Sequence, residues 1–286
     1  MLLRTPVWLT GAVCGRGTLT RTSKTPRSVA GTGQGTPWES KLEQGAADGR
    51  RPGGSRHTAV RIRDGLVIVL ALTSGAIDAV TFVRLGTVFS SVITGNLALL
   101  GLAVGERHGG LAVNSGLALA AYAVGVLAGG ALAGPLEGGQ PVWPRRTTVT
   151  MAAELVVLAG FSAGWLAADG HPSGAGRLAL LALSAAAMGM QSAAVRLLGQ
   201  MSTTYLTSTL IGIFQSLAVR RAPQDWQRST SVLIAFVAGA ALGVAGAGAS
   251  PALVPVTVML PLAVVVLCAA TSASLRRPKD PAGPGA

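Results

Sequence analysis

Charged residues are scarce in this chain. Only 12% of its 286 residues are Asp, Glu, Lys or Arg, roughly half the charged fraction of an ordinary soluble domain. Cysteine is rarer still, and Cys14 and Cys268 offer neither a disulfide framework nor a metal-ligand spacing. The chain also lacks a nucleophile elbow, a phosphate-binding loop, a metal motif and paired carboxylates. The scarcity of charge argues against a soluble protein. Because these motifs are missing, nothing in the sequence indicates an enzyme, a cofactor or a bound metal.

The sequence instead contains long runs of apolar residues. Half of the residues are hydrophobic, and the mean hydropathy is +0.53. Runs of about 17 to 24 apolar residues are long enough to cross a bilayer as helices. The sequence therefore predicts an all-α fold, a polytopic transmembrane helix bundle. Eight apolar segments follow Arg63, at residues 65–85, 88–105, 111–134, 147–168, 178–198, 201–219, 229–249 and 252–273.

The number of full spans stays open between six and eight. The second and sixth segments are short and rich in Thr and Ser, so they form full spans, broken helices or re-entrant segments. Irregular backbone at membrane depth is tolerated only where protein or a water-filled cavity covers it. These two segments are therefore expected to face the interior of the bundle.

The net charge of +12 does not indicate binding to nucleic acid, because most arginines lie in the N-terminal tail and in loops beside apolar runs. Basic loops orient membrane proteins by staying in the cytoplasm. For eight spans in a bacterial inner membrane, both termini are predicted to be cytoplasmic. The inside would then hold Arg107, Arg177, Arg220, Arg221 and Arg228 besides both tails, and the outside would hold Arg84, Arg145, Arg146 and Arg196. The pair at positions 145 and 146 argues against this arrangement.

The chain divides into a tail and a membrane part. Residues 1–60 are rich in Arg, Gly, Thr, Ser and Pro without a long apolar run, which is typical of a disordered basic tail. Alternatively, translation begins near Val60, at a valine codon, because no methionine lies between Met1 and Met151. The expected domains are the tail, a first membrane repeat at 62–170, a second at 175–275 and a cytoplasmic C-terminal tail at 276–286.

A polar pattern that occurs twice defines the two repeats. At a shift of 113 residues, it pairs Asp78 with Gln191, Gly86 with Gly199, Thr94 with Thr207 and Leu97 with Leu210. At a shift of 114, small residues four apart recur as Gly125 and Gly129, then Gly239 and Gly243. Such glycines share one helix face, and their expected role is close helix packing. Four segments per repeat would give both repeats the same orientation, whereas three spans per repeat would invert them.

The repeated polar residues are the candidate path for a solute or an ion. An Asp at the centre of a span costs about 2.5–3.5 kcal/mol to insert and usually faces the bundle interior. We hypothesise that Asp78 carries a proton or pairs with a cationic solute, while Gln191 offers hydrogen bonds only. The alternative is a structural carboxylate that pairs with Arg84 or accepts hydrogen bonds from hydroxyl groups. Glu154, near the start of its segment, is expected to reach the membrane interface. The full candidate set is Asp78, Thr94, Asn96, Gln191, Thr207 and Thr209.

These motifs resemble those of the YoaK family of bacterial membrane proteins. The resemblance rests on residues 74–82, Phe89, 93–97, 188–193 and 203–210, and it covers about residues 62–275. In the second motif, Ser208 stands where the family often has glycine. The resemblance implies an integral, multi-span protein of the inner membrane, and it supplies neither a substrate nor catalytic residues.

Two functions fit these observations. The first is a transporter or permease-like protein with a polar site between its repeats, whose partners are the lipid bilayer and a small solute or a proton. The second is a membrane protein of assembly or interaction, in which the repeated motifs serve helix packing. The sequence predicts no oligomeric state.

Overall fold

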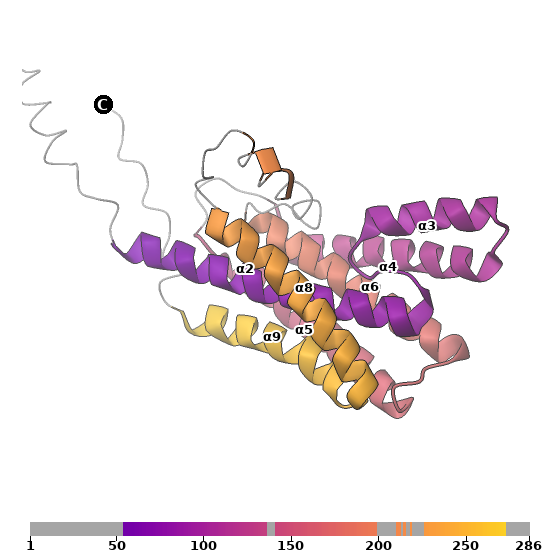
Figure 1. The fold of residues 1–286 in the computed structure, drawn as a ribbon. Coiled ribbons are helices and arrows are strands. Elements are labelled where there is room, and N and C mark those ends of the chain that lie inside the picture. Colours follow the sequence, from indigo (N-terminus) through magenta and orange to yellow (C-terminus); the bar gives the residue numbers. More distant parts are fainter. Residues whose placement is uncertain are drawn as a thin grey trace, which may run out of the picture. The chain divides into compact units, whose positions relative to one another are not determined.

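Apolar segments fold into helices because a helix satisfies its own backbone hydrogen bonds, which the bilayer interior cannot do. The computed structural model describes residues 54–135, 141–198, 210–212, 214–215, 218 and 226–272. Regular structure in this part of the chain is helical, and the long helices lie roughly along one axis (Figure 1). The elements are α2 (Gly54–Val80), the π-helical η1 (Thr81–Gly86), α3 (Ile93–Gly105), α4 (Gly109–Ala133), α5 (Arg145–Ala167), α6 (Gly174–Leu197), α8 (Trp226–Ala249) and α9 (Leu253–Thr271).

Six of the described helices are long and apolar enough to cross a membrane. They are α2 with η1, α4, α5, α6, α8 and α9, so the prediction of a polytopic helix bundle is confirmed. The expected segment 88–105 forms only the 13-residue α3, which is about 20 Å long and too short to span. The expected segment 201–219 lies mostly outside the described residues.

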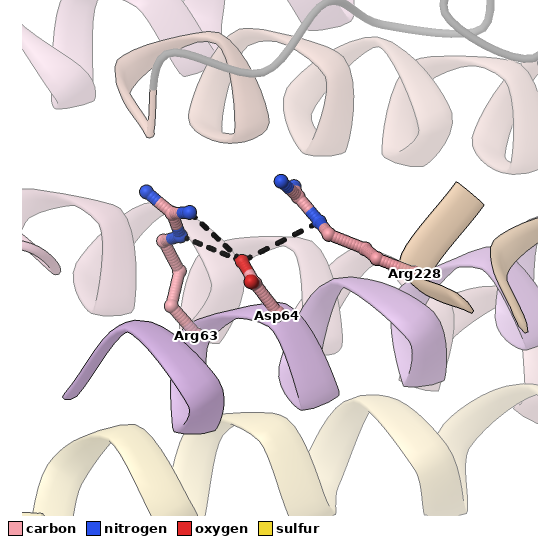
Figure 2. Close-up of polar contacts among 3 residues, drawn as sticks. All are labelled: Arg63, Asp64 and Arg228. Atoms are coloured by element: carbon pink, nitrogen blue, oxygen red, sulfur yellow. Dashed lines mark hydrogen bonds and ion pairs between the residues drawn. The ribbon is translucent and has the colours of Figure 1, made fainter. Parts of the chain in front are cut away.

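Helices α2 and α8 pack along each other in the same direction. Near their starts, Asp64 Oδ1 of α2 lies 3.4 Å from Arg228 Nε of α8 and 2.8 Å from Arg63 Nη2 (Figure 2). Near their ends, Arg84 Nη2 donates a hydrogen bond to the Ala247 carbonyl at 3.0 Å. We call the end of the bundle where α2 and α8 begin the near side, and the opposite end the far side.

Helix α6 runs the other way. Near its middle, Ser184 accepts a hydrogen bond from the Ser90 hydroxyl, which lies beyond the end of α2 in the chain. Close to its end, the Gln191 amide donates to the Leu70 carbonyl, which is nearer the start of α2. Helix α6 therefore begins on the far side and ends on the near side.

Helix α4 runs parallel to α6 and packs closely along it. Gly125 lies against the backbone of Ala186, and Gly129 lies against Met190 one turn further on. A Cβ atom at either glycine would collide with that backbone. Helix α4 therefore also leads from the far side to the near side.

Helices α5 and α9 complete the bundle. Trp165 Nε1, at the end of α5, donates to the carbonyl of Pro251, just before α9 begins, at 3.0 Å. Since α5 begins where α4 has just ended, it leads to the far side, and α9 leads back. Helices α2, α5 and α8 thus cross from near to far, and α4, α6 and α9 cross from far to near.

Large apolar side chains lie both inside and outside the bundle. Phe161 and Trp165 stack inside it and are fully buried. Leu127 and Val156 are 74% and 72% exposed on the outer surface. Exposed leucine and valine along spans of this length suit lipid as the surrounding medium.

Candidate functional site: a polar cluster at a chain reversal

The chain turns back on itself at the end of η1, which continues α2. Gly86 has φ 134° and Thr87 has φ 62°, a left-handed conformation that a threonine rarely adopts. The Thr87 N–H bonds to the Phe82 carbonyl at 3.1 Å. Asn114 of α4 donates to the Gly86 carbonyl at 3.1 Å, and a Cβ atom at Gly86 would collide with the Asn114 side chain. Glycine is needed here both for its φ and for this close contact.

After the reversal, the chain returns to the depth of Asp78. One carboxylate oxygen, Oδ1, accepts the N–H groups of Ser90 at 2.8 Å and Ser91 at 2.7 Å. The other, Oδ2, accepts the Ser91 hydroxyl at 2.5 Å. Residues 88–92 form no helix, so these N–H groups would otherwise lack partners in an apolar medium. Helix α3 starts from this depth and leads back out to the far side, which makes the segment re-entrant.

Asn96 holds the other end of the irregular segment. Its Oδ1 accepts the Phe89 N–H at 2.9 Å, and its Nδ2 donates to the Phe89 carbonyl at 2.6 Å. Gly95 lies under the Phe89 ring, where a Cβ atom would be 3.4 Å from the ring edge. Thr94 is exposed on the outer side of α3. Asn96 therefore closes the loop, and Thr94 stands apart from the cluster.

Hydroxyl groups connect this loop to α6. Thr81 and Ser90 share a hydrogen bond of 2.8 Å between their hydroxyls. The Ser90 hydroxyl donates to Ser184 of α6 at 2.9 Å, and Ser184 donates onward to the Leu181 carbonyl. All three hydroxyl residues are fully buried. The segment is thus tied both to its own half of the chain and to α6.

Gln191 lies one turn of α2 away from Asp78. Its Nε2 donates to the Leu70 carbonyl at 3.2 Å and to Ser74 Oγ at 3.1 Å. Its Oε1 is buried without a hydrogen-bond partner among the described residues. Asp78 and Gln191 therefore occupy neighbouring places along α2 and bind different groups. Thr207 and Thr209 lie outside the described residues.

Glycines bring the helix backbones together around the cluster. Besides Gly125 and Gly129 of α4, Gly239 of α8 lies against the Leu72 backbone, and Gly243 lies against Ala76. A Cβ atom at each position would collide with backbone atoms of the partner helix. These close crossings fix α2 and α6 in place beside α8 and α4.

Glu154 does not reach the interface, because its exposed fraction is 0%. Helix α5 begins at Arg145, which puts Glu154 within two residues of the helix midpoint. Neither of its carboxylate oxygens has a hydrogen-bond partner in the part of the chain that the structure describes. An acidic residue inside an apolar run is the sequence signal that should have marked it.

A cavity of about 420 Å³ lies between α5 and α6 toward the far side. Its lining is mostly small, with Gly160 and Gly164 on one wall, Ala179 and Leu183 on the other, and His171 at the connecting loop. Asp78, Thr94, Asn96 and Gln191 are not among the lining residues. No group of three or more His, Cys, Asp and Glu side chains gathers into a metal site within the described residues.

Comparison with known proteins agrees with this architecture. A family model described as a protein of unknown function, DUF1275, matches residues 66–271. The chain is 32% identical over 165 residues to the UPF0700 transmembrane protein YoaK of Bacillus subtilis (strain 168). The aligned region covers 57% of this chain and 71% of the relative. No solved structure matches the chain. The chain is therefore an integral, multi-pass membrane protein that belongs to the DUF1275 family, together with YoaK.

Proposed function

We propose that this protein is transporter-like and moves a small solute across the membrane between two inverted halves. The observation that carries the proposal is the opposite direction of α2 and α6, the first helices of the two expected repeats. Each half then has three spans, α2, α4 and α5 in the first and α6, α8 and α9 in the second. Inverted halves with a discontinuous helix at mid-depth are typical of secondary transporters. In this proposal its role is not enzymatic.

Paired contacts support an internal repeat. Each of three contacts joins one residue of the first half to one of the second. Adding 114 to the first residue number and subtracting 114 from the second gives another observed contact. The paired contacts are Gly75–Phe236 with Gly189–Tyr122, Gly239–Leu72 with Gly125–Ala186, and Gly243–Ala76 with Gly129–Met190. Two unrelated halves would have no reason to repeat three backbone contacts at one constant shift.

The contacts also refine the register of the repeat. At a shift of 114, Gly75 corresponds to Gly189, and Asp78 therefore corresponds to Ser192. The motif comparison pairs Asp78 with Gln191 at a shift of 113. Close backbone contacts are lost if a helix is shifted by one residue. The shift of 114, which the contacts give, is therefore the better guide inside these helices. The acidic residue of the first half then corresponds to a hydroxyl residue, not an amide, in the second.

The arginines support an orientation. The six-span arrangement leaves Arg84, Arg107 and Arg177 on the far side. It moves the pair at 145 and 146 to the near side, which removes the conflict that eight spans create. The near side then holds Arg61, Arg63, Arg145, Arg146, Arg196 and Arg228. By the positive-inside rule, the near side, where α2 begins and α9 ends, is cytoplasmic in a bacterial inner membrane.

Cysteine labelling tests the orientation and span number together. In a background of Cys14→Ser and Cys268→Ser, intact cells carrying Arg107→Cys or Arg145→Cys are treated with a membrane-impermeant maleimide. We expect Arg107→Cys to react from outside and Arg145→Cys to react only after permeabilisation. Eight spans with cytoplasmic termini give the reverse result.

Transport itself is tested in proteoliposomes made with the full chain. Uptake of labelled amino acids and sugars is measured with and without an imposed pH gradient, against protein-free liposomes. We expect at least one neutral or zwitterionic solute to enter faster with protein, because the buried cluster offers hydroxyl and amide groups. If folded protein moves none of them and crosslinks instead to another membrane protein in cells, the assembly function replaces this proposal.

A further inference from the structure

Glu154 is the buried ionisable group that the polar cluster does not use. It lies near the middle of α5, with an exposed fraction of 0% and no hydrogen-bond partner for either carboxylate oxygen among the described residues. Asp78 differs, since its carboxylate accepts three hydrogen bonds. Donors stabilise the ionised form of a carboxyl group, and of these two carboxylates Asp78 alone has donors among the described residues.

An ionised Glu154 would be an unpaired charge in an apolar interior. Such a charge is far more costly than a neutral polar group, so a carboxyl group in this position keeps its proton. Within the described residues, no charged partner offsets this cost. The ionisable side chains of the helices that pack on α5 are Arg177 and Arg196 of α6, Cys268 of α9 and Tyr122 of α4, and none hydrogen-bonds or ion-pairs with Glu154.

Two threonines lie between Glu154 and the near side. Thr147, Thr150 and Glu154 are three and four residues apart, so they share one face of α5. All three are fully buried. Thr150 donates to the Arg146 carbonyl at 3.0 Å, and the Thr147 hydroxyl has no partner among the described residues. Along the helix axis, Thr147 lies roughly 10 Å from Glu154 on this face of α5, toward the near side.

We propose that Glu154 is a protonation site that holds a proton in this conformation and exchanges it with near-side water along the hydroxyls of Thr150 and Thr147. The exchange is a simple proton transfer between water and a carboxylate oxygen, with no other reactant. The proposal does not depend on transport. Coupling of this proton to solute movement would rest on the proposed function.

Infrared difference spectroscopy of the purified full chain at neutral pH tests the protonation. We expect the carbonyl stretch of a protonated carboxyl group in the wild type, its loss in Glu154→Gln and its retention in Asp78→Asn. Absence of the band in the wild type, or its persistence in Glu154→Gln, overturns the proposal. The test gives the same answer whether or not any solute moves, so failure of transport is separate from failure here.

The route is tested by the rate at which this band shifts after transfer into deuterated buffer. Thr147→Val and Thr150→Val keep the side-chain shape and remove the hydroxyl, and we expect each to slow the shift by about tenfold. Ser162→Ala is the matched control. Its hydroxyl is also buried without a partner in the described residues, about two turns beyond Glu154 toward the far side. Unchanged rates in both valine variants, or equal slowing in Ser162→Ala, contradict the near-side route.

Discussion

Asp78 and Glu154 are two carboxylates inside one bundle with opposite surroundings. Asp78 lies in the last turn of α2, and its Oδ1 accepts the N–H groups of Ser90 and Ser91 from the irregular segment that follows the reversal. Glu154 lies within an unbroken helix, where the backbone N–H groups bond within the helix and none donates to its carboxylate. The difference shows that a buried acid is structural where the backbone is broken, and free for another role where the backbone is intact.

The largest expected effect comes from removing the Asp78 carboxylate. Asp78→Ala removes the carboxylate that accepts two backbone N–H groups and the Ser91 hydroxyl. We expect a loss of about 3–5 kcal/mol in the free energy of unfolding, as for other broken buried charge interactions. Thermal unfolding in detergent, followed by circular dichroism, measures it. Stability like that of the wild type would show that Asp78 does not hold the loop.

Glu154→Leu should act in the opposite direction. An apolar side chain of similar size removes a polar group that has no partner, so we expect a gain of about 1–3 kcal/mol in the free energy of unfolding. Glu154→Gln is the control, since it stays polar and should gain nothing. A loss of stability in Glu154→Leu as large as that in Asp78→Ala would erase the distinction between the two carboxylates.

The apolar runs alone were enough to predict the helix bundle, and the scarcity of charged residues indicated that it spans a membrane. They left 88–105 open as a full span, a broken helix or a re-entrant segment, because it is short and rich in serine and threonine. The path of that segment could not be predicted. It depends on the reversal at Gly86 and Thr87, and a threonine with φ 62° has no sequence signal. Only the reversal brings Ser90 and Ser91 back to Asp78.

Glu154 was misjudged for a different reason. The apolar run suggested a segment from residue 147, which placed the glutamate near an end. Pro144, with φ −63° and ψ 143°, precedes the first helical residue, and a proline at this point favours helix initiation. The two arginines after it therefore belong to the helix, and Glu154 moves toward its centre. The start of a helix, more than its composition, decided the depth of this residue.

The smallest expected effect on the free energy of unfolding comes from replacing one carboxylate oxygen of Asp78 by an amide group. Asp78→Asn keeps an oxygen for the N–H groups of Ser90 and Ser91, and its amide can donate to the Ser91 hydroxyl, which then acts as acceptor. We therefore expect Asp78→Asn to keep the fold at a loss of about 1 kcal/mol. Ser91→Ala should cost more in the wild type, where the hydroxyl bonds to a charged group, than in the Asp78→Asn background. A double-mutant cycle on the unfolding free energies measures the coupling. Additive losses would mean that the 2.5 Å contact between Ser91 and Asp78 contributes nothing beyond what a neutral amide provides.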